Sequence, residues 1–481
     1  MKKYLPICLI LIFSIVFLGL SKNENKTLKE NSKKDTKDII IASYVNGVYT
    51  DELPTESKYF GYVKCFDNSG NEIDSLGFVT WENNKWNVKV TDISASGTCN
   101  VYFIDPPAHW LDAESGTLLK AIKDNNAVEN VRSIPGKQIN KEDEAVLSGT
   151  LDDYGTSYFF RGNVKNNYVQ FAGKCWQIVR VTGDGSIKLT LYNYNSTDCT
   201  ATGETLAYAR YDGTNYGTYY SSVAKGEQYN AHIGFMYGTP GSTTYEKEHE
   251  NLHDNTILTN LKAWYDLSGT FTDNEKEALA DVIWCGDKRV VTDSNYNPSG
   301  YDNLTNSGIG REATYYMGSY RFANGIPSLE CGTSINDNKI SKYTAYDTTY
   351  GNGALNGYKI GLLTSDELMY SGMIYNASSG YLTKNVIYRN STKANNYVVG
   401  YRTMTPATFS NRVNAVTIES YYYSVNSEYD IHGLYGINGS TPDNKMGLRP
   451  AIALNYNVQA TYNASSEYEP GTVNNPYVIS V

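Results

Sequence analysis

The sequence predicts an α+β protein in which a small antiparallel β-sandwich precedes a larger mixed domain with long loops. Two observations lead to this expectation: apolar residues alternate over residues 39–107, and alternating and helical spacings are mixed from Leu147 onward. The chain has 481 residues, which is more than one domain usually holds. We therefore expect two or three domains.

The N-terminal residues are expected to lie outside the folded domains. Two lysines precede an uncharged apolar stretch, Tyr4–Leu20, so residues 1–21 are typical of a signal peptide or an N-terminal membrane anchor. Cleavage after Ser21 and retention as an anchor both remain open. Residues 22–38 are polar and predict a disordered linker. The segment indicates an extracellular, cell-surface protein, tethered to the membrane if the segment is kept.

The charge of the chain bears on its partners. The net charge is −10, whereas binding to nucleic acid needs clustered Lys and Arg. We expect no nucleic-acid partner.

The cysteines predict disulfides. Six cysteines follow the N-terminal segment, and an even number in an exported chain favours oxidised pairs. No CxxC pair is present, so a zinc ribbon is not indicated. Pairing between sequence neighbours predicts Cys65–Cys99, Cys175–Cys199 and Cys285–Cys331.

Residues 39–107 carry the signals of the sandwich. Asn46-Gly47 lies between apolar runs and predicts a tight hairpin, because that turn requires positive φ. Apolar residues alternate along two further stretches, so each predicted strand has one buried face. These residues are Trp86, Val88, Val90, Cys99, Val101 and Phe103.

Residues 108–146 predict a partly helical connector, with a short helix over 115–123, and residues 147–481 predict the large domain. In that domain, strands over Cys175–Thr182 and Ser186–Tyr192 flank a glycine turn, and Ile360–Leu363 and Met446–Leu454 are further expected strands. A helix is expected over Thr256–Leu267. Two more helices are expected to begin at capping boxes, Thr272 with Glu275 and Thr364 with Glu367. The first of these has an apolar face of Leu279, Val282 and Ile283.

The sharpest chemical motif is His249-Glu250-Asn251-Leu252-His253. On a helix the two histidines would share one face and could bind zinc, with Glu250 as the general base and Glu277 as a third ligand. The flanking residues are polar, and Asp254 and Asn255 are typical of a helix start. The favoured interpretation is therefore a polar loop before a helix, without a catalytic residue or a metal.

A calcium site is a weaker alternative. Asp293, Asn295 and Asn297 stand at alternate positions, as calcium ligands do. Pro298 occupies the position where an EF-type loop needs glycine, and no glutamate closes the loop.

Tyrosine is the second functional signal. The chain has 44 Tyr against 13 Phe, and most of the tyrosines lie in loops among Gly, Ser and Asn. Binding loops use this mixture, because tyrosine gives contact area with a polar tip at little entropic cost. The alternative is that the tyrosines are abundant only because this residue is favoured in strands and on partly solvent-exposed surfaces. We expect the binding surface at Tyr401, Arg402, Tyr421, Tyr422 and Tyr423.

Several blocks resemble an uncharacterised family of exported proteins of low-GC Gram-positive bacteria. The blocks are Tyr168–Arg180, Gly234–Gly238, Trp284–Lys288, Gly361–Glu367 and Gly447–Ile452. The last block is similar to the closing strand of C-type-lectin-like domains. The resemblance implies an immunoglobulin-like sandwich followed by a C-type-lectin-like domain, but it implies no reaction.

The favoured function is a surface-displayed ligand-binding or adhesion protein whose partner is an extracellular protein or glycan. The first alternative is a secreted zinc metallopeptidase that uses His249, His253, Glu277 and Glu250. The second alternative is a structural component of the cell envelope.

Overall fold

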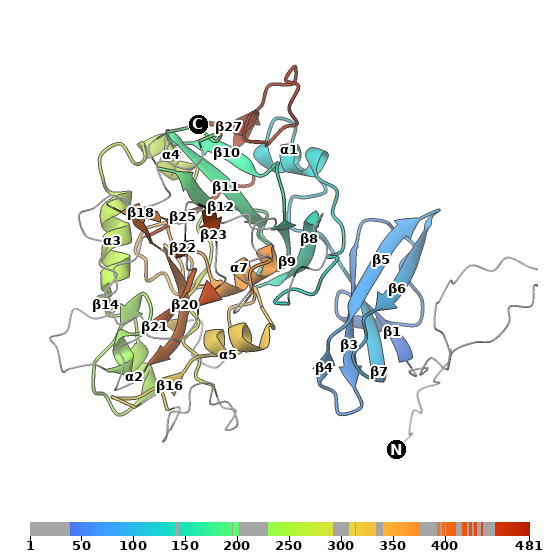
Figure 1. Ribbon diagram of the computed structural model, residues 1–481, viewed down its shortest axis with the longest axis horizontal. Helices are drawn as coiled ribbons and strands as arrows, with labels where there is room; N and C mark the ends of the chain where they lie inside the picture. The colour runs from blue at the N-terminus through green and yellow to red at the C-terminus, as the bar shows by residue number, and fades with distance from the viewer. Residues whose placement is uncertain are drawn as a thin grey trace, which may run out of the picture. The chain divides into compact units, whose positions relative to one another are not determined.

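The computed structural model shows a mixed α+β protein that is richer in strand than in helix (Figure 1). It describes residues 39–137, 139, 144–194, 196–201, 229–291, 307–312, 314–332, 340–374 and 448–481, and strands between residues 392 and 435. Contacts divide the chain into two units. The small unit comprises the chain up to Pro106 together with the later segment Val128–Ile134. The large unit comprises Pro107–Ala127 and Pro135–Val481. The residues of the expected connector, 108–146, are therefore divided between the two units and do not form a separate unit.

The small unit consists of two packed sheets. The five-stranded sheet has the order β2-β1-β7-β3-β4, and the second sheet is the hairpin β5-β6. The bounds are β1 Ile39–Val45, β2 Val48–Thr50, β3 Phe60–Asp67, β4 Glu72–Ile73, β5 Leu76–Glu82, β6 Lys85–Thr91 and β7 Gly97–Ile104. Val79, Trp86, Val101 and Phe103 form the buried core between the sheets. Asn46 and Gly47 have positive φ and make the predicted β1–β2 turn.

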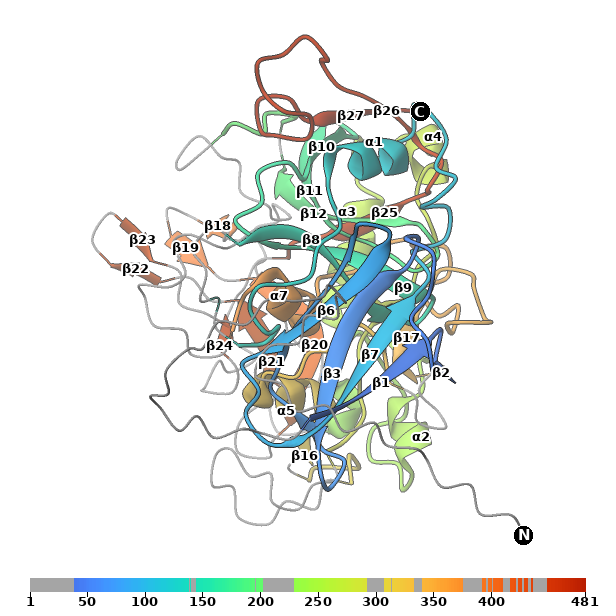
Figure 2. The same cartoon turned by 90° about the vertical axis from the view of Figure 1, so that its right-hand side faces the viewer.

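One pairing in the small unit differs from the expected antiparallel sandwich. Strand β1 runs parallel to β7, whereas β2, β3 and β4 pair antiparallel with their neighbours. Figure 2 looks onto β3, β7, β1 and β2 side by side. Tyr49, Tyr44, Tyr102 and Tyr62 stand at matched positions on these four strands. The last three rings stack with centroids 5.0–5.2 Å apart, which adds cross-strand stabilisation.

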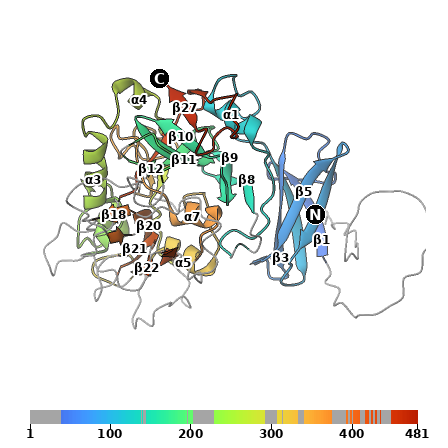
Figure 3. The ribbon, with the colours of Figure 1, turned by 45° about the horizontal axis from the view of Figure 1, so that its top comes forward.

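The large unit is built on a sheet whose described strands follow the order β25-β12-β11-β10-β27-β26, with β9 and β8 joined through β11. The bounds are β8 Ala145–Asp152, β9 Gly155–Gly162, β10 Tyr168–Phe171, β11 Lys174–Val181, β12 Ile187–Asn193, β25 Ala451–Leu454, β26 Gln459–Thr461 and β27 Tyr477–Ser480. The C-terminal strand β27 runs parallel to β10 (Figure 3). Residues far apart in the sequence thus close one sheet.

Helices and short strands surround this sheet. The helices are α1 Leu118–Asn125, α2 Tyr245–His249, α3 Thr256–Tyr265, α4 Asp273–Glu277, α5 Met317–Asn324 and α7 Ser365–Ser371, with the 3₁₀-helix η2 at Asn230–His232. The other strands are β13 Met236–Tyr237, β14 His253–Asp254, β15 Trp284–Cys285, β16 Thr314–Tyr315, β17 Lys342–Tyr343, β18 Thr392–Ala394, β19 Tyr397–Val399, β20 Tyr401–Phe409, β21 Val416–Ser420, β22 Tyr423–Val425, β23 Glu428–Asp430 and β24 Leu434–Tyr435. Within the described residues, no helix is long and apolar enough to cross a membrane. The expected N-terminal segment, residues 1–21, and the linker, residues 22–38, lie outside them.

Two expected elements are wrong in extent. The helix that begins after Thr272 ends at Glu277, because Leu279 bridges Leu454 and the N–H of Ala280 donates to the carbonyl of Ala453. Ile360–Leu363 is buried as expected but forms no strand: within the described part of the chain, Gly361 bridges Ala451 and the carbonyl of Leu363 accepts from the N–H of Met404. In both cases tertiary pairing decides how far the element runs.

The predicted disulfides are confirmed. Cys65–Cys99 joins directly opposed residues of β3 and β7, with a Cα–Cα distance of 3.9 Å. The pairs Cys175–Cys199 and Cys285–Cys331 both have Cα–Cα distances of 5.5 Å. Three disulfides are typical of a protein that works outside the cytoplasm.

Candidate functional site

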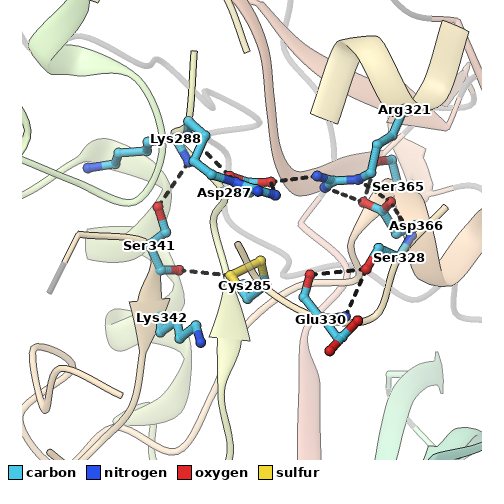
Figure 4. A network of polar contacts seen from close by, with 12 residues as sticks. Cys285, Asp287, Lys288, Arg321, Ser328, Glu330, Ser341, Lys342, Ser365 and Asp366 are labelled. Atoms are coloured by element: carbon cyan, nitrogen blue, oxygen red, sulfur yellow. Dashed lines mark hydrogen bonds and ion pairs between the residues drawn. A yellow bond between two sulfur atoms is a disulfide. The ribbon is translucent and has the colours of Figure 1, made fainter. Parts of the chain in front are cut away.

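A cluster of buried ion pairs occupies the interior of the large unit, and its first half centres on Arg321 of α5 (Figure 4). Arg321 donates to both oxygens of Asp366 on α7, at 2.7 and 2.9 Å, and to Asp287 at 2.6 Å. Arg289 donates two hydrogen bonds to the same Asp287, at 2.8 and 2.9 Å. These contacts tie α5 and α7 to the chain that follows β15.

The second half of the cluster joins α7 to the central sheet. Glu367 accepts hydrogen bonds from Arg180 of β11 at 3.0 Å and from Lys188 of β12 at 2.6 Å. Arg180 also donates to Asp152 at the end of β8. Glu367 additionally closes the capping box of α7 with Thr364, as the sequence predicts. The Glu367 carboxylate therefore both stabilises the N-terminus of α7 and attaches this helix to the central sheet.

The charge cluster, defined as these ion-paired residues, is internally balanced. Burial opposes ionisation of Asp287, yet Arg321 and Arg289 hold its pKa well below the ordinary value. Burial likewise opposes ionisation of Glu367, and Lys188 and Arg180 lower its pKa. The cavity inside the cluster measures about 20 Å³, room for about one water. We interpret the cluster as structural, since its charges are matched and its cavity admits no larger ligand.

An open groove on the same unit has a different character. Its volume is about 440 Å³, within the usual range of small-molecule sites. It lies where the end of α3, the end of α4 and the chain segment 346–359 meet. The lining residues are Tyr265, Asp266, Lys276, Glu277, Tyr346, Asn356, Gly357, Tyr358 and Lys359. We call this site the tyrosine groove.

Three tyrosines supply the aromatic surface of the tyrosine groove. Tyr265 is buried and meets Tyr358 edge to face, with ring centroids 5.4 Å apart. The Tyr358 hydroxyl donates to Asp266 at 2.6 Å, which fixes the orientation of its ring. Tyr346 is 68% exposed. Burial and neighbouring Tyr346 and Asp266 raise the pKa of Tyr265 to about 12, so this hydroxyl stays protonated at neutral pH.

The chain segment that carries Tyr346 is held rigidly. The carboxylate of Asp281 accepts hydrogen bonds from three successive backbone N–H groups, those of Ala345, Tyr346 and Asp347, at 2.6–2.8 Å. The hydroxyl of Thr344 bridges the two ends of the turn that follows, since it donates to the carbonyl of Asp347 and accepts from the N–H of Gly353. Tyr346 is therefore presented on a preorganised backbone.

Charged and amide groups complete the tyrosine groove. Lys276 stands over the Tyr265 ring, with Nζ 5.1 Å from the centroid. Lys359 donates one hydrogen bond to the carbonyl of Leu279 at 2.6 Å. Glu277 and Asn356 are exposed. The groove thus combines aromatic rings with hydrogen-bond donors and acceptors that face solvent.

The zinc-type motif does not lie on one helix. Helix α2 ends at His249, and Glu250 adopts an extended backbone at its C-cap. His249 is fully buried and its Nε2 donates to the carbonyl of Gly308 at 2.8 Å. His253 lies in β14 and is exposed, with its ring 5.1 Å from that of Tyr237. The two histidines therefore occupy different environments, and the expected polar loop is wrong for His249, which ends helix α2 and is buried.

The structure describes only some of the other predicted site residues. Among the described residues, no group of three His, Cys, Asp or Glu side chains is arranged to hold a metal ion. Glu277, the proposed third zinc ligand, lines the tyrosine groove. The calcium positions Asp293, Asn295 and Asn297 lie outside the described residues, as do Tyr421 and Tyr422. Only the backbone of Tyr401, Arg402 and Tyr423 is described, in β20 and β22.

Comparison of the chain with protein-family models, with curated proteins and with solved structures finds no match in any of the three. The resemblance to a family of exported Gram-positive proteins, and the immunoglobulin-like and C-type-lectin-like folds that it implies, therefore stay predictions.

Proposed function

We propose that this chain is an exported ligand-binding protein whose ligand occupies the tyrosine groove. The observation that supports this most is the exposure of Tyr346 beside Tyr358 in an open groove of about 440 Å³. The groove brings together three tyrosines, of which Tyr346 is exposed and Tyr358 half-buried, and tyrosine is prominent among residues that dominate binding energy.

The setting of the groove favours binding. Asp281 and Thr344 fix the segment behind Tyr346, so little conformational entropy is lost when a ligand arrives. Asp266 accepts one hydrogen bond from the Tyr358 hydroxyl, and Lys359 donates one to a carbonyl. The groups that can meet a ligand are rings, ammonium groups, carboxylates and an amide, which recognise molecules by shape and hydrogen bonding.

A binding screen tests this proposal. The purified full-length chain, kept soluble with mild detergent, is applied to arrays of extracellular glycans and proteins beside two variants. Tyr346→Ala removes the exposed ring of the groove, whereas Tyr468→Ala removes a tyrosine that is 46% exposed and does not line it. We expect Tyr346→Ala to lose affinity by about tenfold, as for an interface anchor. Equal binding by both variants would place the site elsewhere.

A further inference from the structure

We infer that the ligand of the tyrosine groove is a neutral carbohydrate; this inference rests on the proposed function and adds the chemical class of the ligand. Three properties of the groove lead to it: the balance of its charges, the mixture of its donors and acceptors, and the exposure of an aromatic face.

The charges that line the groove cancel. Lys276 and Lys359 are the cations, and Asp266 and Glu277 are the anions. A site for an anionic polymer would present an excess of cations, and a site for a basic peptide would present an excess of anions. The lining offers neither excess, so a ligand without net charge fits it best.

The groups that can reach a ligand include both donors and acceptors. The Lys276 ammonium only donates and the Glu277 carboxylate only accepts, whereas the Asn356 amide does both. The Tyr358 hydroxyl donates a hydrogen bond to Asp266 and keeps lone pairs that can accept. Sugar hydroxyls each donate and accept, so a polyhydroxylated ligand can satisfy all of these groups at once.

The aromatic surface suits the apolar face of a sugar ring. Tyr346 is 68% exposed, and the nearby Tyr358 ring is held in place by Asp266. A pyranose carries C–H groups on one face and hydroxyls at its edge, which matches a tyrosine ring bordered by polar groups. A peptide that binds by adding a strand would need a free strand edge, but none of the lining residues belongs to a strand.

Titration calorimetry on the full-length chain tests the ligand class. The probes are neutral hexose and N-acetylhexosamine oligosaccharides, their uronic-acid and sulfated counterparts, and peptides of matched length. We expect the neutral oligosaccharides to bind, with affinity that changes by less than about twofold between low and high salt, because no net charge is involved. Tyr346→Ala is expected to weaken this binding by about tenfold, and Tyr346→Phe, which keeps the ring, by less than about threefold.

Two further variants and the choice of probes distinguish a wrong ligand class from a wrong binding site. Glu277→Gln is expected to weaken neutral-sugar binding by about fivefold, since it removes a charge-assisted acceptor, while Tyr468→Ala leaves it unchanged. If charged sugars or peptides bind instead, and Tyr346→Ala abolishes that binding, the groove stands and the carbohydrate class is overturned. If no probe binds, or binding is indifferent to Tyr346→Ala, the groove and the ligand class both fail.

Discussion

The backbone N–H of Tyr346 donates a hydrogen bond to Asp281 Oδ2 at 2.7 Å, and this contact sets the position of the most exposed ring in the tyrosine groove. The same carboxylate also holds the N–H groups of Ala345 and Asp347. Asp281 is thus a positioning residue: it binds the backbone that carries the ring and does not line the groove.

Replacement of Asp281 by Asn should loosen this segment. An amide keeps only one oxygen, so at least one of the three backbone N–H groups loses its acceptor, at a cost of about 1–3 kcal/mol. Urea unfolding should show a lower midpoint, and calorimetry should show weaker ligand binding. Asp112→Asn changes an exposed aspartate and serves as the matched control. Equal midpoints for the two variants would show that Asp281 does not hold the segment.

Gly357→Ala should disturb the position of Tyr346. Gly357 has a φ of +91°, and a Cβ built there lies 3.0 Å from the Tyr346 hydroxyl oxygen. Gly269 has a similar φ of +83° but open space around it, so Gly269→Ala introduces the same backbone strain, about 1 kcal/mol, without the contact. We expect comparable losses of stability from both variants but weaker ligand binding from Gly357→Ala alone. Unchanged affinity in Gly357→Ala would contradict this placement of the ring.

The charge cluster should tolerate the loss of Arg321 poorly. Arg321→Met leaves the buried carboxylates of Asp366 and Asp287 without their main partner, which typically costs about 3–5 kcal/mol. Lys120→Met breaks a surface pair with Asp124 and should cost less than about 0.5 kcal/mol. Chemical unfolding of both variants checks the comparison. A cost for Arg321→Met as small as that for Lys120→Met would mean that the cluster does not organise the fold.

Stability should rise between pH 7 and pH 10 because of Lys288. Its ammonium is buried and donates to the carbonyls of Met236 and His249, and burial lowers its pKa to about 7. The unfolded chain releases this proton only near its ordinary pKa of 10.5, so between these values the unfolded state binds more protons and higher pH favours folding. The slope for one such group is at most about 1.4 kcal/mol per pH unit.

Lys288→Met removes this titration. Unfolding free energies measured at pH 7, 8 and 9 should rise more steeply for the wild type than for Lys288→Met, with Lys120→Met following the wild type. Identical slopes in all three proteins would show that Lys288 is not titrating in this range.

Local signals in the sequence predict several elements correctly. Asn46-Gly47 forms its turn and Thr272 and Thr364 form their capping boxes, because these structures depend on residues within four positions of one another. The disulfides also follow from short separations. Helix α4 ends early because Leu279 and Ala280 pair with the distant strand β25, and sequence spacing carries no sign of such pairing.

The sequence could predict the aromatic character of the tyrosine groove but not the residues that form it. The excess of tyrosine indicates an aromatic binding surface, but the groove draws Tyr265, Lys276 and Tyr346 from three separate segments. The sequence also cannot show that Asp281 binds the backbone N–H groups of residues 345–347. The charge cluster is equally hidden, since Arg180, Arg321 and Glu367 lie far apart in the chain and read as ordinary surface charges until the fold buries them.

A crystal structure of the chain with the tightest-binding neutral oligosaccharide tests the central claim most directly. We expect one sugar ring to pack against Tyr346 with carbon atoms within about 4.5 Å, and its hydroxyls to reach Glu277 or Asn356. Oligosaccharide density elsewhere on the molecule, with the tyrosine groove filled only by solvent, would contradict the assignment.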